Sequence, residues 1–399
     1  MWLRVGLVLT LVASVAMRAC ERFAATVGEG QCLRHAVRAA LPRSDATPTL
    51  TKLRKTSSLK SRQVNKRVAA VTATASSPAT EAFRSPASCF ELLRQGVRAG
   101  RSQGMARVGT WNVRWFPDGV AGDTLDSNLA TDVEWMACTL AWMNVDAMAL
   151  AEVKSKPRSL AALEQLVSRL DALTNGKHTV HLDDCPDENG QHVAWLVNEQ
   201  RVRVADWQMH APLNPNGDAC AGLLRPGLGV NLRFLGGLDL HAVAVHLKSG
   251  VEARDIELRR GSFDGLERVL QSVSSRNGDA DVLVAGDFNS MGCSSCPTVM
   301  RSAAETSWLD NRLRAFRPQA RRIPSELGCS EYYRQQPTLL DHVLVTSAMR
   351  EAPLDTVASV YGHCRELGCE AYSGSEPLAM GHLSDHCPIV VTLLDQDLD

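Results

Sequence analysis

Residues 283–296 read LVAGDFNSMGCSSC, where a hydrophobic run stops abruptly at polar side chains. The apolar run Val282–Ala285 has the length and character of a buried strand. Asp287 and Asn289 follow almost at once, and Phe288 between them should point the opposite way and pack, because side chains alternate along a strand. A carboxylate and an amide at the end of a core strand raise the question of whether other strands end in the same way.

Other predicted strands carry polar residues of the same kind at their ends. They are Asn112 with Arg114, Glu152 with Lys154, His246, Asp341, and Asp385 with His386. Each has an ordinary interpretation when taken alone, since an Asp beside a strand is commonly a turn residue. Their recurrence is harder to explain that way, because ligands of α/β sheets bind where strand ends converge. The pattern predicts one functional site at the edge of a sheet.

The rest of the body alternates predicted strands with a few predicted helices. Strands are predicted over 108–113, 147–150, 192–197, 201–207, 228–235, 238–247, 282–285, 340–345 and 388–394, and helices over 128–143, 159–173 and 252–273. Gly236 and Gly237 predict a hairpin turn between two of the strands. Strands mixed with helices and hairpins predict an α/β or α+β sandwich that carries its helices on the outside.

The first residues have the composition of a secretory signal. Residues 1–19 combine one charge at Arg4, an apolar run, and small side chains near Ser14 and Ala16,. The run is too short to span a membrane comfortably. The protein is therefore expected to be secreted or periplasmic. Translation from Met105 would instead leave it in the cytoplasm.

Charge divides the chain into a basic arm and an acidic body. Residues 1–105 hold 17 Lys and Arg against 5 Asp and Glu, whereas residues 106–399 hold 26 against 39. Residues 20–105 are predicted to be a largely disordered extension, with a linker over 40–88 and a possible short helix at Cys89–Val97. The acidic body, 106–399, is unlike a tight non-specific nucleic-acid binder, which is usually basic.

Twelve cysteines are consistent with an exported protein. Cys138 and Cys387 fall in helix and strand patterns and are predicted to be buried thiols. Seven others lie in loop-like stretches and predict disulfides: Cys185, Cys220, Cys293, Cys296, Cys329, Cys364 and Cys369. A zinc site is the less favoured alternative, because the spacing matches no known finger. A bond from Cys293 or Cys296 to Cys329 is a specific hypothesis, since it would stiffen two loops of the site.

The polar residues at the strand ends suit the hydrolysis of a phosphate ester. Glu152, Asp385 and Asn112 offer hard oxygen ligands of the kind that Mg²⁺, Mn²⁺ or Ca²⁺ prefers. The imidazoles of His246 and His386 can move protons near neutral pH. A hard metal, two histidines and a water activated beside Asp287 describe metal-assisted hydrolysis, with Arg114 and Lys154 as phosphate contacts.

The motifs GTWNVRWF, ALAEVKS, AVHLKSG, VAGDFNS, LLDHVLV and LSDHCPIVV, in this order, resemble those of the endonuclease/exonuclease/phosphatase superfamily over about residues 106–394. The resemblance implies a four-layer sandwich of two mixed β-sheets packed face to face, with helices outside. It implies hydrolysis of phosphodiesters or phosphomonoesters with Mg²⁺ or a similar ion. The sequence is similar to the deoxyribonuclease I branch of this superfamily at three places: Asn-x-Arg at 112–114, Glu-x-Lys at 152–154, and His246.

The resemblance also implies a role for each residue. Asn112, Glu152 and Asp385 are expected at the metal, His246 at the scissile phosphate, Asp287 and Asn289 beside the attacking water, Asp341 paired with His386, and His386 as general base. The family's partner for the first histidine is not assigned, and Gln191 and Glu188 are the nearest candidates. A secreted, monomeric DNA endonuclease, with RNA as a further substrate, is predicted. The alternatives are a sphingomyelinase-like phosphodiesterase, an enzyme for a small phosphate ester, and a non-catalytic binding module.

Overall fold

The computed structural model describes residues 77–120, 129–185, 190–215, 224–225, 227–277 and 281–399. Residues 73–399 form one compact unit. The predicted signal at 1–19 and most of the predicted extension lie outside the described residues. Among the helices that are described, none combines the length and the apolar character needed to cross a membrane.

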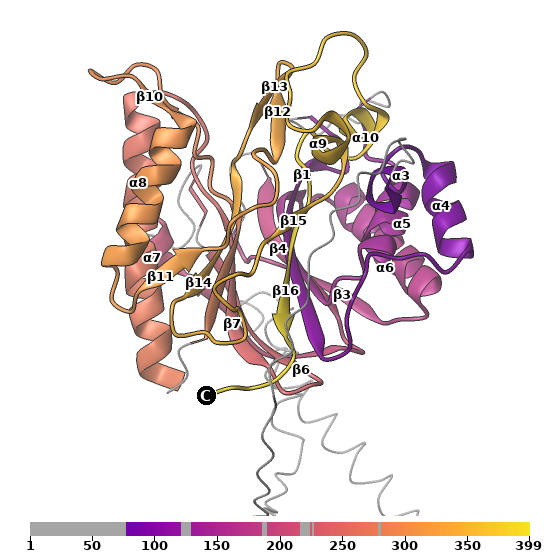
Figure 1. Ribbon diagram of the computed structural model, residues 1–399, viewed down its shortest axis with the longest axis horizontal. Coiled ribbons are helices and arrows are strands. Elements are labelled where there is room, and N and C mark those ends of the chain that lie inside the picture. The colour runs from indigo at the N-terminus through magenta and orange to yellow at the C-terminus, as the bar shows by residue number, and fades with distance from the viewer. Residues whose placement is uncertain (1–76, 121–128, 186–189, 216–223, 226, 278–280) are drawn as a thin grey trace, which may run out of the picture. The chain divides into compact units, whose positions relative to one another are not determined.

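One sheet, sheet A, joins six strands in the spatial order β15, β16, β1, β2, β4, β3 (Figure 1). Its strands are β1 (Met105–Phe116), β2 (Ala147–Lys154), β3 (His178–Leu182), β4 (Gln191–Asn198), β15 (Ser359–Val360) and β16 (Ile389–Leu394). The pair β1 and β2 is parallel, and the other neighbours are antiparallel, so the sheet is mixed.

A second six-stranded sheet, sheet B, has the order β11, β14, β8, β7, β6, β5. Its strands are β5 (Val202–His210), β6 (Gly227–Phe234), β7 (Asp239–His246), β8 (Val282–Asp287), β11 (Ala320–Arg322) and β14 (Asp341–Thr346). Only β7 and β8 run parallel. The hairpin predicted between β6 and β7 is confirmed, and Gly237 occupies its left-handed turn position at φ 122°.

The two sheets pack face to face through a shared hydrophobic core. Alternate residues of each strand point into it, as Val193 and Trp195 of β4 do from one side and Leu283 and Ala285 of β8 from the other. Fully burying one such aliphatic side chain stabilises the fold by roughly 1.5–3 kcal/mol. The intervening residues of the same strands face outward and pack under helices, as period-two alternation requires.

Helices cover both outer faces and complete the predicted four layers. Sheet A is covered by α4 (Pro86–Arg94), α5 (Val133–Met143) and α6 (Pro157–Thr174), and sheet B by α7 (Ala253–Asn277) and α8 (Ser302–Ala315), as Figure 1 shows on its right and left sides. The remaining elements are short: α3 (Pro78–Glu81), η1 (Ala211–Leu213), α9 (His363–Leu367), α10 (Leu378–His382) and the two-stranded pairs β9 (Gly292–Cys293) with β10 (Met300–Arg301) and β12 (Glu331–Tyr333) with β13 (Gln336–Thr338).

The folded body begins upstream of the predicted boundary at residue 106. A capping box at Ser85 starts α4, and Cys89 of this helix is disulfide-bonded to α5. Phe83 packs edge-on against the rings of Trp111 and Trp142. The predicted linker over 40–88 was therefore wrong for residues 77–88, because a few apolar side chains anchor a segment whose composition is polar. The short helix predicted at Cys89–Val97 is present as α4, three residues earlier in the sequence.

Some predicted helix limits differ from the structure for local reasons. The helix predicted over 128–143 begins at Val133, because the Asp132 side chain accepts a hydrogen bond from the backbone N–H of Trp135 at 3.0 Å and caps it. Helix α8 was not predicted. Its buried side chains are few among polar neighbours, so its periodicity is weak.

Disulfides are confirmed for six of the seven loop cysteines, and the seventh, Cys220, lies outside the described residues. The bonds are Cys89–Cys138, Cys293–Cys296, Cys329–Cys369 and Cys364–Cys387, and Cys185 is also disulfide-bonded. Cys138 and Cys387 are thus not thiols, and the hypothesised bond from Cys293 or Cys296 to Cys329 does not form. No cysteine among the described residues is free. Cys293 and Cys296 are three residues apart, whereas the other three bonds join cysteines 23 to 49 residues apart in the sequence. Local sequence patterns do not reveal these distant partners.

Candidate active site

Strand register brings three predicted site residues into one row of sheet B. His246, the last residue of β7, lies opposite Asp287, the last residue of β8. Asp287 in turn lies opposite Asp341, the first residue of β14. Phe288 turns away and is buried in the core beneath α7 and α8, as its alternation predicts. Three polar ends therefore meet because the strands stop in register.

Sheet A delivers its site residues through irregular backbone. The pairing of β2 with both β1 and β4 shifts register near Glu152, which adopts a left-handed φ of 64°. Arg114 and Asn289 also have positive φ, 45° and 49°. Bulges re-aim side chains, and positive φ in residues other than glycine costs of order 1–3 kcal/mol, so such positions cluster at functional sites.

Asp287 lies at the centre of the site. Its Oδ2 accepts a hydrogen bond from Asn112 Nδ2 at 3.0 Å, and its Oδ1 accepts one from the backbone N–H of Asn289 at 2.8 Å. The Nε2 atoms of His246 and His386 lie 3.6 and 3.8 Å from the same Oδ2. One buried carboxylate therefore separates two imidazoles.

The predicted pairing of His386 with Asp341 is present in the structure. His386 Nδ1 lies 2.8 Å from Asp341 Oδ2, and both side chains are buried. This contact directs the other ring nitrogen, Nε2, toward Asp287. Ser384 fixes the preceding backbone, because its hydroxyl donates to the carbonyl of Asn112 at 2.7 Å and accepts from the N–H of His386 at 3.1 Å.

The pKa values of His246 and His386 are shifted in opposite directions by their surroundings. Burial lowers the pKa of His246 well below its ordinary value, and the charge of Arg225 lowers it further. Burial also disfavours a charged His386, but Asp341, Asp287 and Asp385 outweigh it and hold its pKa well above the ordinary value. These surroundings favour the neutral form of His246 and the charged form of His386.

The carboxylates repel one another. Burial and the charge of Asp341 raise the pKa of Asp287 to about 7. Burial and the charge of Asp385 raise the pKa of Glu152 as well. Acids placed so close together in a poorly solvated site are stabilised by a bound cation.

The side chains predicted to bind a metal have the oxygen atoms that a hard divalent cation needs. Glu152 and Asp385 offer carboxylate oxygens, which Mg²⁺, Mn²⁺ and Ca²⁺ prefer. Asn112 presents its amide nitrogen to Asp287, and its Oδ1 accepts the N–H of Arg114 at 3.0 Å. The Asn112 oxygen keeps a second lone pair, so it could join the two carboxylates as a ligand of the cation. Asp287, Asp341 and His386 form a second group of possible ligand atoms, all within 4.8 Å of one another.

The contacts of Arg114 differ from the phosphate contact that the sequence predicted. Its guanidinium donates to the carbonyl oxygens of Leu129, Met380 and Gly381 at 2.7–3.0 Å. These bonds hold the segment of α10 against the end of β1. Arg114 thus binds backbone, and the predicted phosphate contact is not supported.

Lys154 also has a different environment from the one predicted. Its ammonium group lies 2.8 Å from Asp118 Oδ2 and 2.7 Å from the carbonyl of Val120, and the side chain is buried. Asp118 pairs through its other oxygen with Arg158. The lysine therefore stabilises a loop beside β2, in place of the predicted phosphate contact.

Replacing Lys154 with methionine is expected to destabilise the protein by about 3 kcal/mol, because it breaks a buried ion pair. Urea unfolding measures the change. Lys156→Met, at an exposed position two residues further on, is the control. If the Lys154→Met variant kept its stability but bound substrate more weakly, the result would support the predicted contact between Lys154 and phosphate.

Three further residues belong to the site and were not predicted. Arg225 precedes β6, donates to the side chain of Gln191, and lowers the pKa of both Glu152 and His246. Ser330 immediately precedes β12 and Glu331 begins it, next to the His386 backbone, and burial raises the pKa of Glu331 to about 8. Only their nearness to cysteines could have singled out the last two.

Among the described residues, no acidic side chain contacts Nδ1 of His246, the ring nitrogen on the side away from Asp287. His246 Nδ1 is buried without a hydrogen-bond partner among the described residues. Gln191, one of the two candidates, contacts Arg225, and the other, Glu188, lies outside the described residues. Asn289 instead secures this strand end, because its Nδ2 donates to the carbonyl of Leu247 at 3.0 Å.

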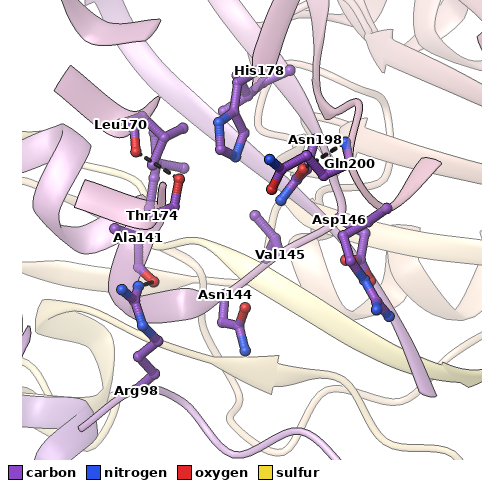
Figure 2. Close-up of a pocket in the computed structure, with 13 residues that line it drawn as sticks. Arg98, Ala141, Asn144, Val145, Asp146, Leu170, Thr174, His178, Asn198 and Gln200 are labelled. Atoms are coloured by element: carbon purple, nitrogen blue, oxygen red, sulfur yellow. Dashed lines mark hydrogen bonds and ion pairs between the residues drawn. The ribbon is translucent and has the colours of Figure 1, made fainter. Parts of the chain in front are cut away.

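A separate cavity of about 160 Å³ lies beside the opposite end of β2 (Figure 2). Its charged groups are matched within the protein: Arg98 donates to the carbonyls of Ala141 and Leu173, and Asp146 accepts from Arg201 at 3.3 Å. None of the predicted site residues lines this cavity. It is thus a polar packing feature between α5, α6 and sheet A.

Comparisons with known proteins place this site in context. The endonuclease/exonuclease/phosphatase family model matches residues 109–386. Among curated proteins, no match is found. Similar solved structures include an endonuclease/exonuclease/phosphatase from Bacteroides vulgatus (TM-score 0.49, 15% identity, 74% of this chain and 99% of that one) and D. rerio TDP2 complexed with single-strand DNA product (0.47, 18%, 73% and 99%). A mannosyl-6-phosphatase from Bacteroides thetaiotaomicron is also similar (0.48, 11%, 72% and 99%).

Proposed function

The chain belongs to the endonuclease/exonuclease/phosphatase family of phosphate-ester hydrolases, and we propose that it hydrolyses phosphodiesters in DNA. The observation that carries the proposal is the pair of imidazole Nε2 atoms 3.6 and 3.8 Å from one oxygen of Asp287. Two proton-transfer groups on either side of one point suit an in-line displacement, in which one group activates the nucleophile and the other protonates the leaving oxygen.

His386 is the proposed general base. Its Nδ1 is held by Asp341, so its Nε2 is free to take a proton from a water that also hydrogen-bonds to Asp287. The 3.8 Å between Nε2 and Oδ2 leaves both atoms within hydrogen-bond reach of one such water,. The water attacks phosphorus and transfers its proton to His386 while the bond between phosphorus and the leaving oxygen breaks. The negative charge of the bound phosphodiester would favour a protonated His246, which then gives its proton to the leaving oxygen.

A divalent cation held by Glu152 and Asp385 would supply positive charge to the phosphoryl oxygens and offset the carboxylate charge that favours protonated His386. Mg²⁺ is proposed first, with Mn²⁺ or Ca²⁺ as replacements. The donor set of two carboxylates supports a hard ion.

The balance of charge supports a diester substrate. Four acids, Glu152, Asp287, Asp341 and Asp385, surround the centre, whereas Arg225 and Lys248 are the arginine and lysine whose charges act on His246. A dianionic monoester would be repelled more strongly than a monoanionic diester. This argument disfavours a phosphomonoesterase.

A phospholipid diester is the second candidate. Arg114 and Lys154, which had favoured nucleic acid, contact internal partners. The acidic balance of residues 106–399 also favours it. DNA stays first because His246 matches the deoxyribonuclease I branch. Disulfides at every described cysteine support an exported protein, since the cytosol keeps thiols reduced,. We propose a secreted or periplasmic monomer.

A substrate panel tests the proposal. Purified protein is incubated with supercoiled plasmid, RNA, sphingomyelin and p-nitrophenyl phosphate, with and without Mg²⁺. Metal-dependent nicking of the plasmid is expected. Hydrolysis of sphingomyelin without nicking would select the second candidate, and no hydrolysis of any diester would refute both.

A further inference from the structure

The two halves of the Asp341–His386 pair belong to different sheets. Asp341 opens β14 of sheet B, whereas His386 lies three residues before β16 of sheet A. Their 2.8 Å contact therefore depends on how the edges of two separate sheets are held together at this point. Neither strand alone determines the geometry of the pair.

Ser330 binds the Asp341 half with its side chain. Its hydroxyl oxygen accepts from the backbone N–H groups of Leu340 and Asp341 at 3.0 and 2.9 Å. The hydroxyl also lies 2.8 Å from Asp341 Oδ2. Since the two N–H donors occupy its acceptor positions, its single proton must point to this oxygen. Ser330 is completely buried, so water does not compete for these bonds.

Ser330 also binds the His386 half, through its backbone. Its carbonyl accepts from the N–H of Cys387 at 2.7 Å, and the N–H of Tyr332 donates to the carbonyl of Asp385 at 3.2 Å. Residue 331 thus forms an antiparallel bridge with His386. Ser330 therefore contacts Asp341 directly, and its backbone is joined to the segment of His386 through Cys387 and the bridge at residue 331.

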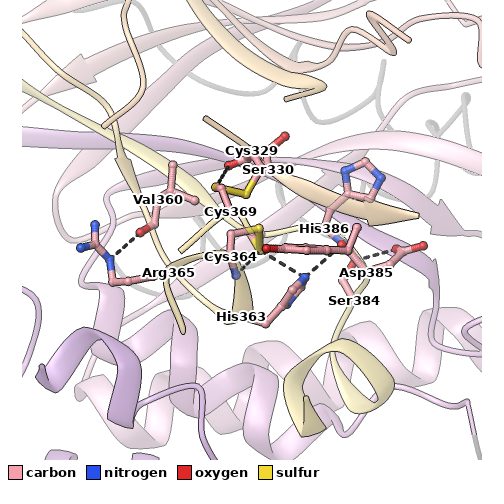
Figure 3. The surroundings of a disulfide bond; sticks show 12 residues. Cys329, Ser330, Val360, His363, Cys364, Arg365, Cys369, Ser384, Asp385 and His386 are labelled. Atoms are coloured by element: carbon pink, nitrogen blue, oxygen red, sulfur yellow. Dashed lines mark hydrogen bonds between the residues drawn. A yellow bond between two sulfur atoms is a disulfide. The ribbon is translucent and has the colours of Figure 1, made fainter. Parts of the chain in front are cut away.

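Two disulfides anchor this junction (Figure 3). Cys329, which precedes Ser330, is bonded to Cys369, and Cys387, which follows His386, is bonded to Cys364. Cys329 lies two residues before Glu331 on one side of the bridge, and Cys387 lies one residue after His386 on the other. The cross-links limit how far the two segments can separate.

We propose that Ser330 is a positioning residue that aligns Asp341 with His386 across the two sheets, an inference that rests on the proposed function. Asp341 Oδ1 is buried and has no hydrogen-bond partner among the described residues. Without the serine hydroxyl, the side-chain carboxylate would be held by His386 alone. It could then rotate, and His386 would lose the fixed direction of its Nε2.

Ser330→Ala tests this alignment. We expect kcat for the diester substrate to fall about tenfold, the rate equivalent of one hydrogen bond to a charged group, with KM unchanged. Ser330→Thr, which keeps the hydroxyl, should restore most of kcat if its melting temperature shows that it is folded. Ser262→Ala removes a buried serine from α7, away from the site, and should leave kcat unchanged.

A double-mutant cycle with Asp341→Asn separates positioning from a general loss of structure. If Ser330 acts through Asp341, Ser330→Ala should have little further effect in the Asp341→Asn background. Equal losses of kcat in both backgrounds would overturn the proposal, as would an unchanged kcat in folded Ser330→Ala.

A measurement independent of activity keeps this proposal distinct from the proposed function. The His386 Nδ1 proton in its bond to Asp341 should give a far-downfield proton NMR signal in the wild type, which Asp341→Asn removes. Ser330→Ala should shift or broaden this signal, while Ser262→Ala should not. An unaltered signal in Ser330→Ala would refute the positioning role even if the enzyme proves inactive on every diester. If the signal responds as expected but no diester is hydrolysed, only the proposed function fails.

Discussion

Replacing His386 with alanine is expected to lower the rate of plasmid nicking by at least about a hundredfold, the usual contribution of a general base. The physical reason is that, among the described residues, His386 is the imidazole that a carboxylate orients beside Asp287. His246 lies on the other side of Asp287 and has no partner at Nδ1 among the described residues, so it is poorly placed to replace the base.

The control for this prediction is His382→Ala. His382 is exposed, lies four residues away in the sequence, and belongs to α10. Initial rates of nicking and melting temperatures of both variants decide the outcome. A folded His386→Ala enzyme that retains nearly full activity would disprove the proposed base, whatever the substrate.

Replacing Glu152 with glutamine is expected to reduce activity about a thousandfold, because a bound metal ion contributes several kcal/mol to catalysis. Glutamine keeps the size of the side chain and removes its charge. The same substitution should weaken Mg²⁺ or Mn²⁺ binding, measured by calorimetry without substrate. EDTA should abolish wild-type activity, and added Mg²⁺ should restore it.

Glu164→Gln, on the exposed face of α6, is the matched control and should bind metal normally. Burial and the charge of Asp385 raise the pKa of Glu152, and a bound cation would favour its ionised form,. Normal metal affinity in folded Glu152→Gln would assign the ion to other ligands, such as the group of Asp287, Asp341 and His386.

Sequence patterns predicted the parts of this protein that depend on local chemistry. Period-two alternation identified the strands that form the core, including the outward turn of Phe288. Polar residues at the ends of those strands identified His246, Asp287, Asp341 and His386, which the structure brings together. Such patterns work because burial acts on each strand separately, and a polar group that interrupts a buried run has an energetic cost that requires a reason.

The tertiary structure alone decided which partner each polar or sulfur-containing side chain meets. Arg114 and Lys154 carry charge at the expected strand ends, but loops far away in the sequence supply the carbonyls and the carboxylate that bind them. Disulfide pairs and the Ser330 bridge join segments that share no periodicity. Strand formation depends on neighbours in the sequence, whereas pairing depends on which distant segments the packing of two sheets brings within bonding distance.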